Sequence, residues 1–187
     1  MARRLRSRHA LWLAAMALPA AVSARAEVSR DSPLEYAVKM AYLPKFANYV
    51  DWPTSAFATP QSDLTLCITG AEPFSGTADS AIEGQHVGER RIVVRHLDNV
   101  YRESGCQILF VAGVDPKRVG KVVDSVLGTG VLTVSEVEPA GQTPSIIRFV
   151  IADNHVRFAI DVQAAAQNGI SVSSKLLSLA LTVTPQR

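Results

Sequence analysis

The alternation of apolar and polar segments predicts strands and helices in turn along most of the chain. Short apolar runs bounded by Gly, Pro or polar residues are typical of buried strands, and apolar residues three or four apart are typical of amphipathic helices. Strands and helices that alternate at this spacing form a mainly parallel sheet with right-handed crossovers. Helices are expected at residues 33–50, 75–82 and 115–128, and strands at 64–69, 91–95, 106–112 and 131–134.

The last third of the chain has a different pattern, which predicts an antiparallel hairpin at the edge of the sheet. Apolar segments 146–151 and 156–162 flank the turn residues Asp153-Asn154-His155. Two short helices are expected after the hairpin, at 163–168 and 175–181. The expected fold class is therefore α/β, with three layers: a mainly parallel sheet flanked by helices, and a C-terminal antiparallel hairpin.

The first 26 residues have the three parts of a secretory signal peptide. Four arginines lie within the first eight residues, an apolar run covers 10–22, and Ala24-Arg25-Ala26 gives the small-x-small exit. The apolar run is shorter than the roughly 20 residues that span a bilayer. We therefore expect residues 1–26 to be cleaved and residues 27–187 to form a single exported domain. An uncleaved membrane anchor is the alternative.

Removal of this leader changes the sign of the net charge. The leader holds five of the 19 basic residues and none of the 17 acidic residues, so residues 27–187 carry a net charge of −3. Nucleic-acid binding needs a basic patch on the folded domain. The mature composition therefore argues against a nucleic-acid partner.

Two cysteines, Cys67 and Cys106, lie in the mature chain. In an oxidising compartment two cysteines are more often paired than free. The pair would close a loop of 40 residues, which is worth about 4 kcal/mol on the chain-entropy model. Two buried, unpaired thiols are the alternative. The sequence leaves open whether the bond is structural or reports the redox state.

No motif in the chain predicts catalysis, a metal or a cofactor. His86, His96 and His155 do not stand at the spacing of a metal site, and no nucleophile elbow or phosphate-binding glycine loop is present. We therefore expect a protein that is not an enzyme and that has no cofactor; an unrecognised hydrolase is the weakest of the alternatives.

Two regions are candidates for binding. The crevice at the carboxyl ends of the strands, near residues 70–72 and 113–115, could hold a small molecule. The segment 168–177 mixes small polar and aliphatic residues, so it is either a docking surface or a loop that packs Ile170 and Val172 into the core.

Segments spread over nearly all of the mature chain match one known family. They are 36–43 with Phe46 and Trp52-Pro53, 67–70 with Pro73-Phe74, 84–94, 106–111, 131–135, 146–149, 156–161 and 164–177. On these segments the chain resembles the YfiR-like family of periplasmic regulators. The resemblance implies a periplasmic protein that can form a homodimer. It also implies that this protein binds and inhibits the periplasmic sensor domain of an inner-membrane diguanylate cyclase, the enzyme that makes cyclic di-GMP.

The resemblance also implies roles for particular residues. Cys67 and Cys106 match one of the family's two cysteine pairs, which implies redox responsiveness, whereas residues 141–148 lack the second pair. Ala159 stands where an acidic residue is expected. The residues implied in partner binding are Gly169, Ile170, Ser171, Ser173 and Lys175.

Overall fold

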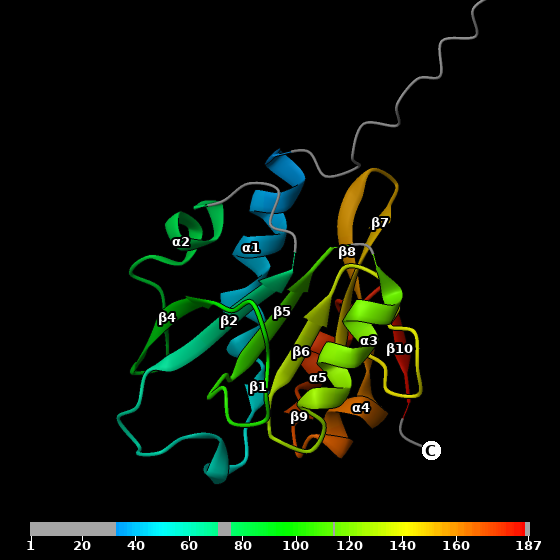
Figure 1. Cartoon of the computed structure of the whole chain (residues 1–187). Coiled ribbons are helices and arrows are strands. Elements are labelled where there is room, and N and C mark those ends of the chain that lie inside the picture. Colours follow the sequence, from blue (N-terminus) through cyan, green and yellow to red (C-terminus); the bar gives the residue numbers. More distant parts are fainter. Residues whose placement is uncertain (1–32, 71–75, 114, 186–187) are drawn as a thin grey trace, which may run out of the picture. The chain divides into compact units, whose positions relative to one another are not determined.

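The centre of the protein is an eight-stranded mixed sheet, shown in Figure 1. A computed structural model describes residues 33–70, 76–113 and 115–185. The strand order is β10-β8-β7-β6-β5-β2-β4-β3. The five neighbouring strands β7, β6, β5, β2 and β4 run parallel to one another. β7 and β8 pair antiparallel. The strands are β2 (Leu64–Gly70), β3 (His86–Val87), β4 (Arg90–His96), β5 (Ile108–Ala112), β6 (Leu132–Ser135), β7 (Ile147–Ala152), β8 (His155–Asp161) and β10 (Thr182–Thr184).

Helices cover both faces of this sheet, as the predicted three-layer α/β fold requires. Alternate residues of β5 face opposite cores: Ile108 and Phe110 join a large cluster with α1, whereas Leu109 and Val111 join a smaller one under α3. The remaining elements are α1 (Pro33–Ala47), β1 (Val50–Asp51), a 3₁₀ turn (Thr54–Ala56), α2 (Thr77–Ile82), α3 (Pro116–Ser125), α4 (Val162–Gln167), β9 (Ser171–Val172) and α5 (Ser174–Leu177).

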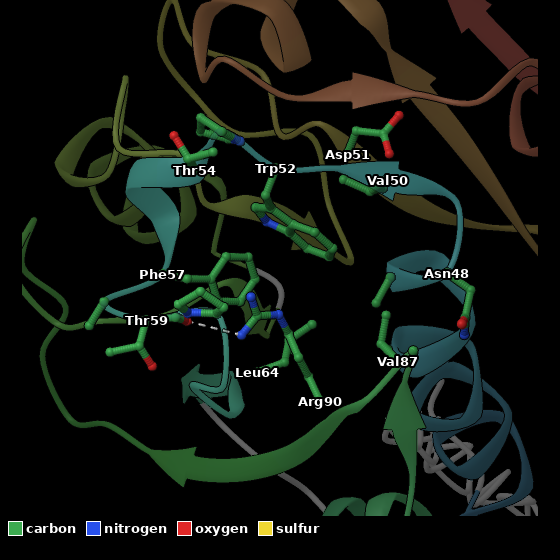
Figure 2. Close-up of a pocket in the computed structure, with 15 residues that line it drawn as sticks. Asn48, Val50, Asp51, Trp52, Thr54, Phe57, Thr59, Leu64, Val87 and Arg90 are labelled. Atoms are coloured by element: carbon green, nitrogen blue, oxygen red, sulfur yellow. Dashed lines mark hydrogen bonds between the residues drawn. The ribbon is translucent and has the colours of Figure 1, made fainter.

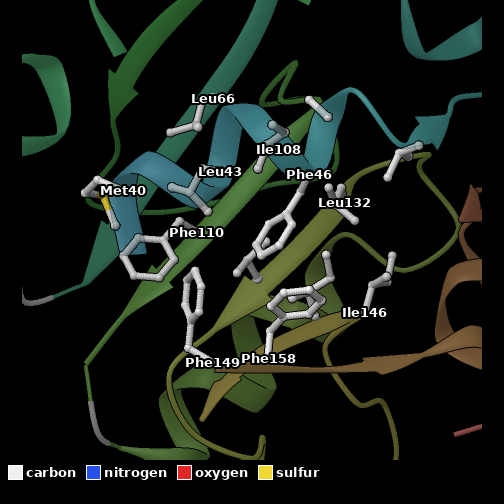
Figure 3. Packing of buried hydrophobic residues seen from close by; sticks show 14 of the residues in the cluster. Met40, Leu43, Phe46, Leu66, Ile108, Phe110, Leu132, Ile146, Phe149 and Phe158 are labelled. Atoms are coloured by element: carbon white, nitrogen blue, oxygen red, sulfur yellow. The ribbon is translucent and has the colours of Figure 1, made fainter. Parts of the chain in front are cut away.

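Aromatic side chains hold α1 across the sheet (Figure 3). Phe46 of α1 lies 5.0 Å from Phe158 of β8 and 5.8 Å from Phe149 of β7, measured between ring centroids. Phe149 is in turn 6.2 Å from Phe110 of β5. Tilted and edge-to-face pairs at these distances add to the burial of apolar area. The end of α1 is therefore fixed in place, and with it the start of the following β1 segment.

The first helix is shorter than its apolar pattern predicts. It continues through Pro44 but ends at Ala47, and Val50 belongs to β1 rather than to the helix. The Asn48 side-chain amide donates to the Pro44 carbonyl at 3.0 Å and closes the last turn. Val50 then pairs with Val172, which is 122 residues further along. A distant strand thus ends the helix, which periodicity alone could not show.

The predicted hairpin is confirmed, but it does not form the edge of the sheet. Asp153 and Asn154 have φ of 50° and 59°, as the two central residues of a type I′ turn require. The predicted last helix is only one turn long, and the chain continues into β10, which pairs parallel to β8 and lies outside it.

The predicted leader, residues 1–26, lies outside the described residues. Within the part of the chain that the structure describes, no helix is both long and apolar enough to cross a membrane.

Candidate functional site

The two cysteines form a disulfide, as predicted, and the alternative of two free thiols is wrong. Cys67 of β2 and Cys106, which precedes β5, have Cα atoms 5.7 Å apart. Their relative exposures are 0% and 5%, and they pack in the smaller core with Val119 and Val123 of α3. Thiol–disulfide exchange needs access to a sulfur. This burial favours a structural bond over a redox sensor.

The five predicted partner-binding residues divide into two groups. Ile170 is buried in the main core at 3% exposure, and the Ser173 hydroxyl accepts from the N–H of Leu176 and caps α5. Gly169, Ser171 and Lys175 are exposed. The segment therefore packs Ile170 into the core, as one of the two interpretations expected, and also exposes residues that a partner could contact, as the other required.

This segment is joined to the front of the chain by a two-stranded ribbon. The β1–β9 ribbon consists of Val50–Asp51 and Ser171–Val172, which pair antiparallel. The N–H of Ser173 also donates to the Tyr49 carbonyl at 2.9 Å, and Lys175 Nζ lies 5.4 Å from the centroid of the Tyr49 ring. Residues 49–51 are thus direct neighbours of the candidate docking segment, which sequence reasoning missed.

A cavity of about 720 Å³ adjoins the ribbon; we call it the Trp52 pocket (Figure 2). Leu64 and Arg90 line it and are the first residues of β2 and β4, so it lies at the amino ends of these strands. The crevice predicted from the sequence is at the opposite, carboxyl ends, and its residues 71, 72 and 114 lie outside the described residues. The pocket is also lined by Ala47, Asn48, Val50, Asp51, Trp52, Pro53, Thr54, Phe57, Ala58, Thr59, Pro60, Val87 and Gly88.

Gln107 holds the wall of this pocket in place. Its Nε2 donates to the Ala56 carbonyl at 2.5 Å, and its Oε1 accepts from the N–H of Thr65 at 2.8 Å. Its main-chain carbonyl accepts from Trp52 Nε1 at 3.2 Å. Gln107 is only 7% exposed. In the sequence, the only sign of this role is that a polar residue stands near the start of the apolar run 106–112.

A cation lies on the aromatic wall of the Trp52 pocket. The Arg90 guanidinium carbon is 3.8 Å from the centroid of the Phe57 ring. Phe57 in turn meets Trp52 edge to face, with 6.1 Å between ring centroids. Cation–aromatic contacts of this kind are attractive. The pocket therefore combines two rings with a positive charge.

The carboxyl ends of the strands carry a different arrangement, a buried ion group. Lys39 Nζ lies 2.8 Å from Glu35 and 2.9 Å from Glu136. Glu136 also accepts from the N–H of Gly113 at 2.7 Å. A buried lysine is stable only with such partners. These contacts tie α1 to the loops that follow β5 and β6.

The histidines of the mature chain are dispersed. His86 and His155 each contact a nearby main-chain carbonyl, whereas His96 pairs with Asp79 at 3.0 Å. Among the residues with described positions, no three of the His, Cys, Asp and Glu side chains form a group that could hold a metal ion.

The fold and the described surface define an α/β domain with partly exposed residues 169–175 and a pocket. A family model described as YfiR/HmsC-like matches residues 36–181. The chain therefore belongs to the YfiR/HmsC-like family, as its resemblance indicated. Proteins of this family are periplasmic regulators of diguanylate cyclase signalling rather than enzymes. Comparison with curated proteins finds no match.

Proposed function

We propose that this protein binds the periplasmic sensor domain of an inner-membrane diguanylate cyclase and inhibits the cyclase. The family match over residues 36–181 carries this proposal. The predicted leader supports it, because an exported protein of this kind meets the outward-facing part of an inner-membrane protein.

An apolar surface near the C-terminus supports a docking role. Six large hydrophobic residues are exposed in the described part of the chain, and three of them are Leu179, Leu181 and Val183, at 60%, 50% and 40%. No charged residue occurs between positions 178 and 185. Exposed apolar patches commonly mark interaction sites.

The backbone of this surface is also available for pairing. β10 is the outermost strand of the sheet and pairs on one side only, with β8. Edge strands are usually protected by charged residues or bulges, and β10 has no charge. We place partner docking on the C-terminal docking segment, defined as residues 169–183, which includes the exposed Gly169, Ser171 and Lys175 among the predicted partner-binding residues.

Calorimetric titration tests this proposal. Purified residues 27–187, oxidised and reduced, are titrated with the periplasmic domain of a membrane cyclase encoded beside this gene. We expect saturable binding, and inhibition when the full cyclase is assayed in membranes. If neither form binds, the proposed function is wrong. Light scattering on the same samples measures whether the regulator is the homodimer that the family implies.

A matched pair of variants tests the surface separately from the function. Leu181→Lys places a charge on the docking segment, and Ile151→Lys places one on the β7–β8 hairpin; both native side chains are 50% exposed. We expect Leu181→Lys to weaken binding at least about tenfold, as loss of a central interface residue does. Ile151→Lys is expected to bind as the wild type does. Equal binding by the two variants would place the interface elsewhere.

A further inference from the structure

We propose that the Trp52 pocket is a binding site for a small aromatic organic anion. Its volume of about 720 Å³ lies within the range of roughly 300–1,000 Å³ that is typical of small-molecule sites. Such sites combine apolar walls with a few well-placed polar groups. This inference goes beyond cyclase regulation and does not depend on it.

The walls of the pocket suit a flat apolar group. Trp52 and Phe57 supply aromatic surface, and Val50, Leu64 and Val87 are among the aliphatic residues that line it. Figure 2 shows Val87 across the cavity from Trp52 and Phe57. An aromatic ring of the ligand between these walls would contact the Trp52 and Phe57 rings offset or edge-on, the arrangements that aromatic pairs prefer.

The charge of the ligand follows from Arg90. Its Nη1 donates to the carbonyls of Ser62 at 2.5 Å and Thr59 at 3.4 Å. These bonds fix the side chain with its guanidinium over the Phe57 ring, where Figure 2 shows it. Nε and Nη2 make no hydrogen bond to any described residue, so three N–H groups can face an anion.

The other polar groups of the wall do not oppose this assignment. Asp51 belongs to the β1–β9 ribbon, and its carboxylate points away from Arg90 in Figure 2. The Asn48 amide already donates to Pro44. Arg90 is thus the charged group that faces the cavity, and a carboxylate, sulfonate or phosphate on an aromatic ring is its complement.

Two dyes that differ in one charge test the proposal. 8-Anilinonaphthalene-1-sulfonate is an aromatic anion, and N-phenyl-1-naphthylamine has the same ring system without the sulfonate. Trp12 lies in the predicted leader, so Trp52 is the one tryptophan of residues 27–187. Energy transfer from Trp52 to the dye therefore reports binding near this residue, and the Arg90 variant below locates it in the pocket. We expect the anion to bind saturably with one site, more tightly than the neutral dye, and to quench Trp52.

Neighbouring arginines provide the matched control. Arg90→Gln is expected to weaken the anionic dye about tenfold, the loss typical of a hydrogen bond to a charged group, and to leave the neutral dye unchanged. Arg91→Gln, whose native side chain pairs with Asp63 at 3.0 Å away from the pocket lining, should affect neither dye. Equal affinity of the two dyes, or anion binding that leaves Trp52 unquenched, would overturn the proposal.

A second pair of variants covers the case in which Arg90→Gln fails to fold. Ala58 lines the pocket and is exposed, so we expect a substitution there to leave the core intact. Ala58→Glu should weaken the anionic dye by repulsion, and Ala58→Gln should not. If Ala58→Glu and Ala58→Gln bind the anion equally, the site does not select for negative charge. These measurements use no cyclase, so they fail or succeed independently of the proposed function.

Discussion

At the scale of single residues, Gln107 shows how one side chain determines the shape of a surface. Its side-chain amide joins the carbonyl of Ala56 to the N–H of Thr65 near the start of β2, and its main-chain carbonyl accepts from the indole of Trp52. All three groups come from segments distant from it in sequence. The Trp52 pocket therefore depends on a residue that does not line it.

Replacement of Gln107 by Leu should destabilise the protein by about 2–4 kcal/mol, because two main-chain groups would lose their partners in a place with little access to water. Urea denaturation followed by Trp52 fluorescence measures this difference. Gln85→Leu is the control, since Gln85 is exposed, and should change stability by less than about 0.5 kcal/mol. A similar cost for both variants would contradict the role given to Gln107.

At the scale of elements, close packing of α3 depends on a glycine in its middle. A Cβ at Gly120 would lie 2.0 Å from the carbonyl oxygen of Ala140, in the loop that follows β6. The same loop donates its Ala140 N–H to the Pro116 carbonyl at 2.8 Å. Contact of this closeness leaves no room for a side chain.

Gly120→Ala should therefore destabilise the protein, although alanine normally stabilises a helix by about 1 kcal/mol relative to glycine. Overpacking against a main-chain atom costs about 1–3 kcal/mol. Thermal unfolding of Gly120→Ala, compared with the exposed Lys117→Ala on the same helix, measures whether the substitution lowers or raises stability. A melting temperature at or above that of the wild type would show that the loop moves away without cost.

The central strands were predictable from the sequence because each carries its own signal. β2, β5 and β6 are largely apolar runs buried on both faces, and the helices predicted between strands indicated a mainly parallel sheet. β1, β3, β9 and β10 have two or three residues each. Such short strands exist only through their partners, so neither the β1–β9 ribbon nor the edge strand could be foreseen.

The candidate site was predictable only in part for the same reason. Gly169, Ser171 and Lys175 lie on the surface as expected. The Trp52 pocket is assembled from the end of α1, the loop after β1 and the starts of β2 and β4. Only the tertiary structure brings these pieces together, and it does so at the strand ends opposite those that a parallel sheet usually offers to ligands.

At the scale of the whole molecule, the disulfide joins β2 to the residue that precedes β5, its neighbour in the sheet, in the core beneath α3. The loop it closes, residues 67–106, contains α2, β3 and β4. Because both sulfurs are buried, reduction requires the protein to open. The absence of a second cysteine pair from the sequence agrees with a bond that stabilises rather than senses.

The variant with both Cys67→Ala and Cys106→Ala should lose about 2–4 kcal/mol of stability, as removal of a disulfide usually does. It should nevertheless bind the cyclase domain as the wild type does at a temperature where both are folded. In native wild-type protein, mass spectrometry after dithiothreitol and alkylation should find the bond intact unless urea is added. Rapid reduction without urea would instead make the bond accessible and favour redox control.

The β1–β9 ribbon has a thermodynamic consequence. One of its strands lines the Trp52 pocket, and the other lies within the docking segment. If an aromatic anion favours one position of the ribbon and the cyclase favours the same one, each raises the affinity of the other by an identical factor. The cell could then tune cyclic di-GMP production through the periplasmic concentration of a metabolite, with no change in the amount of regulator.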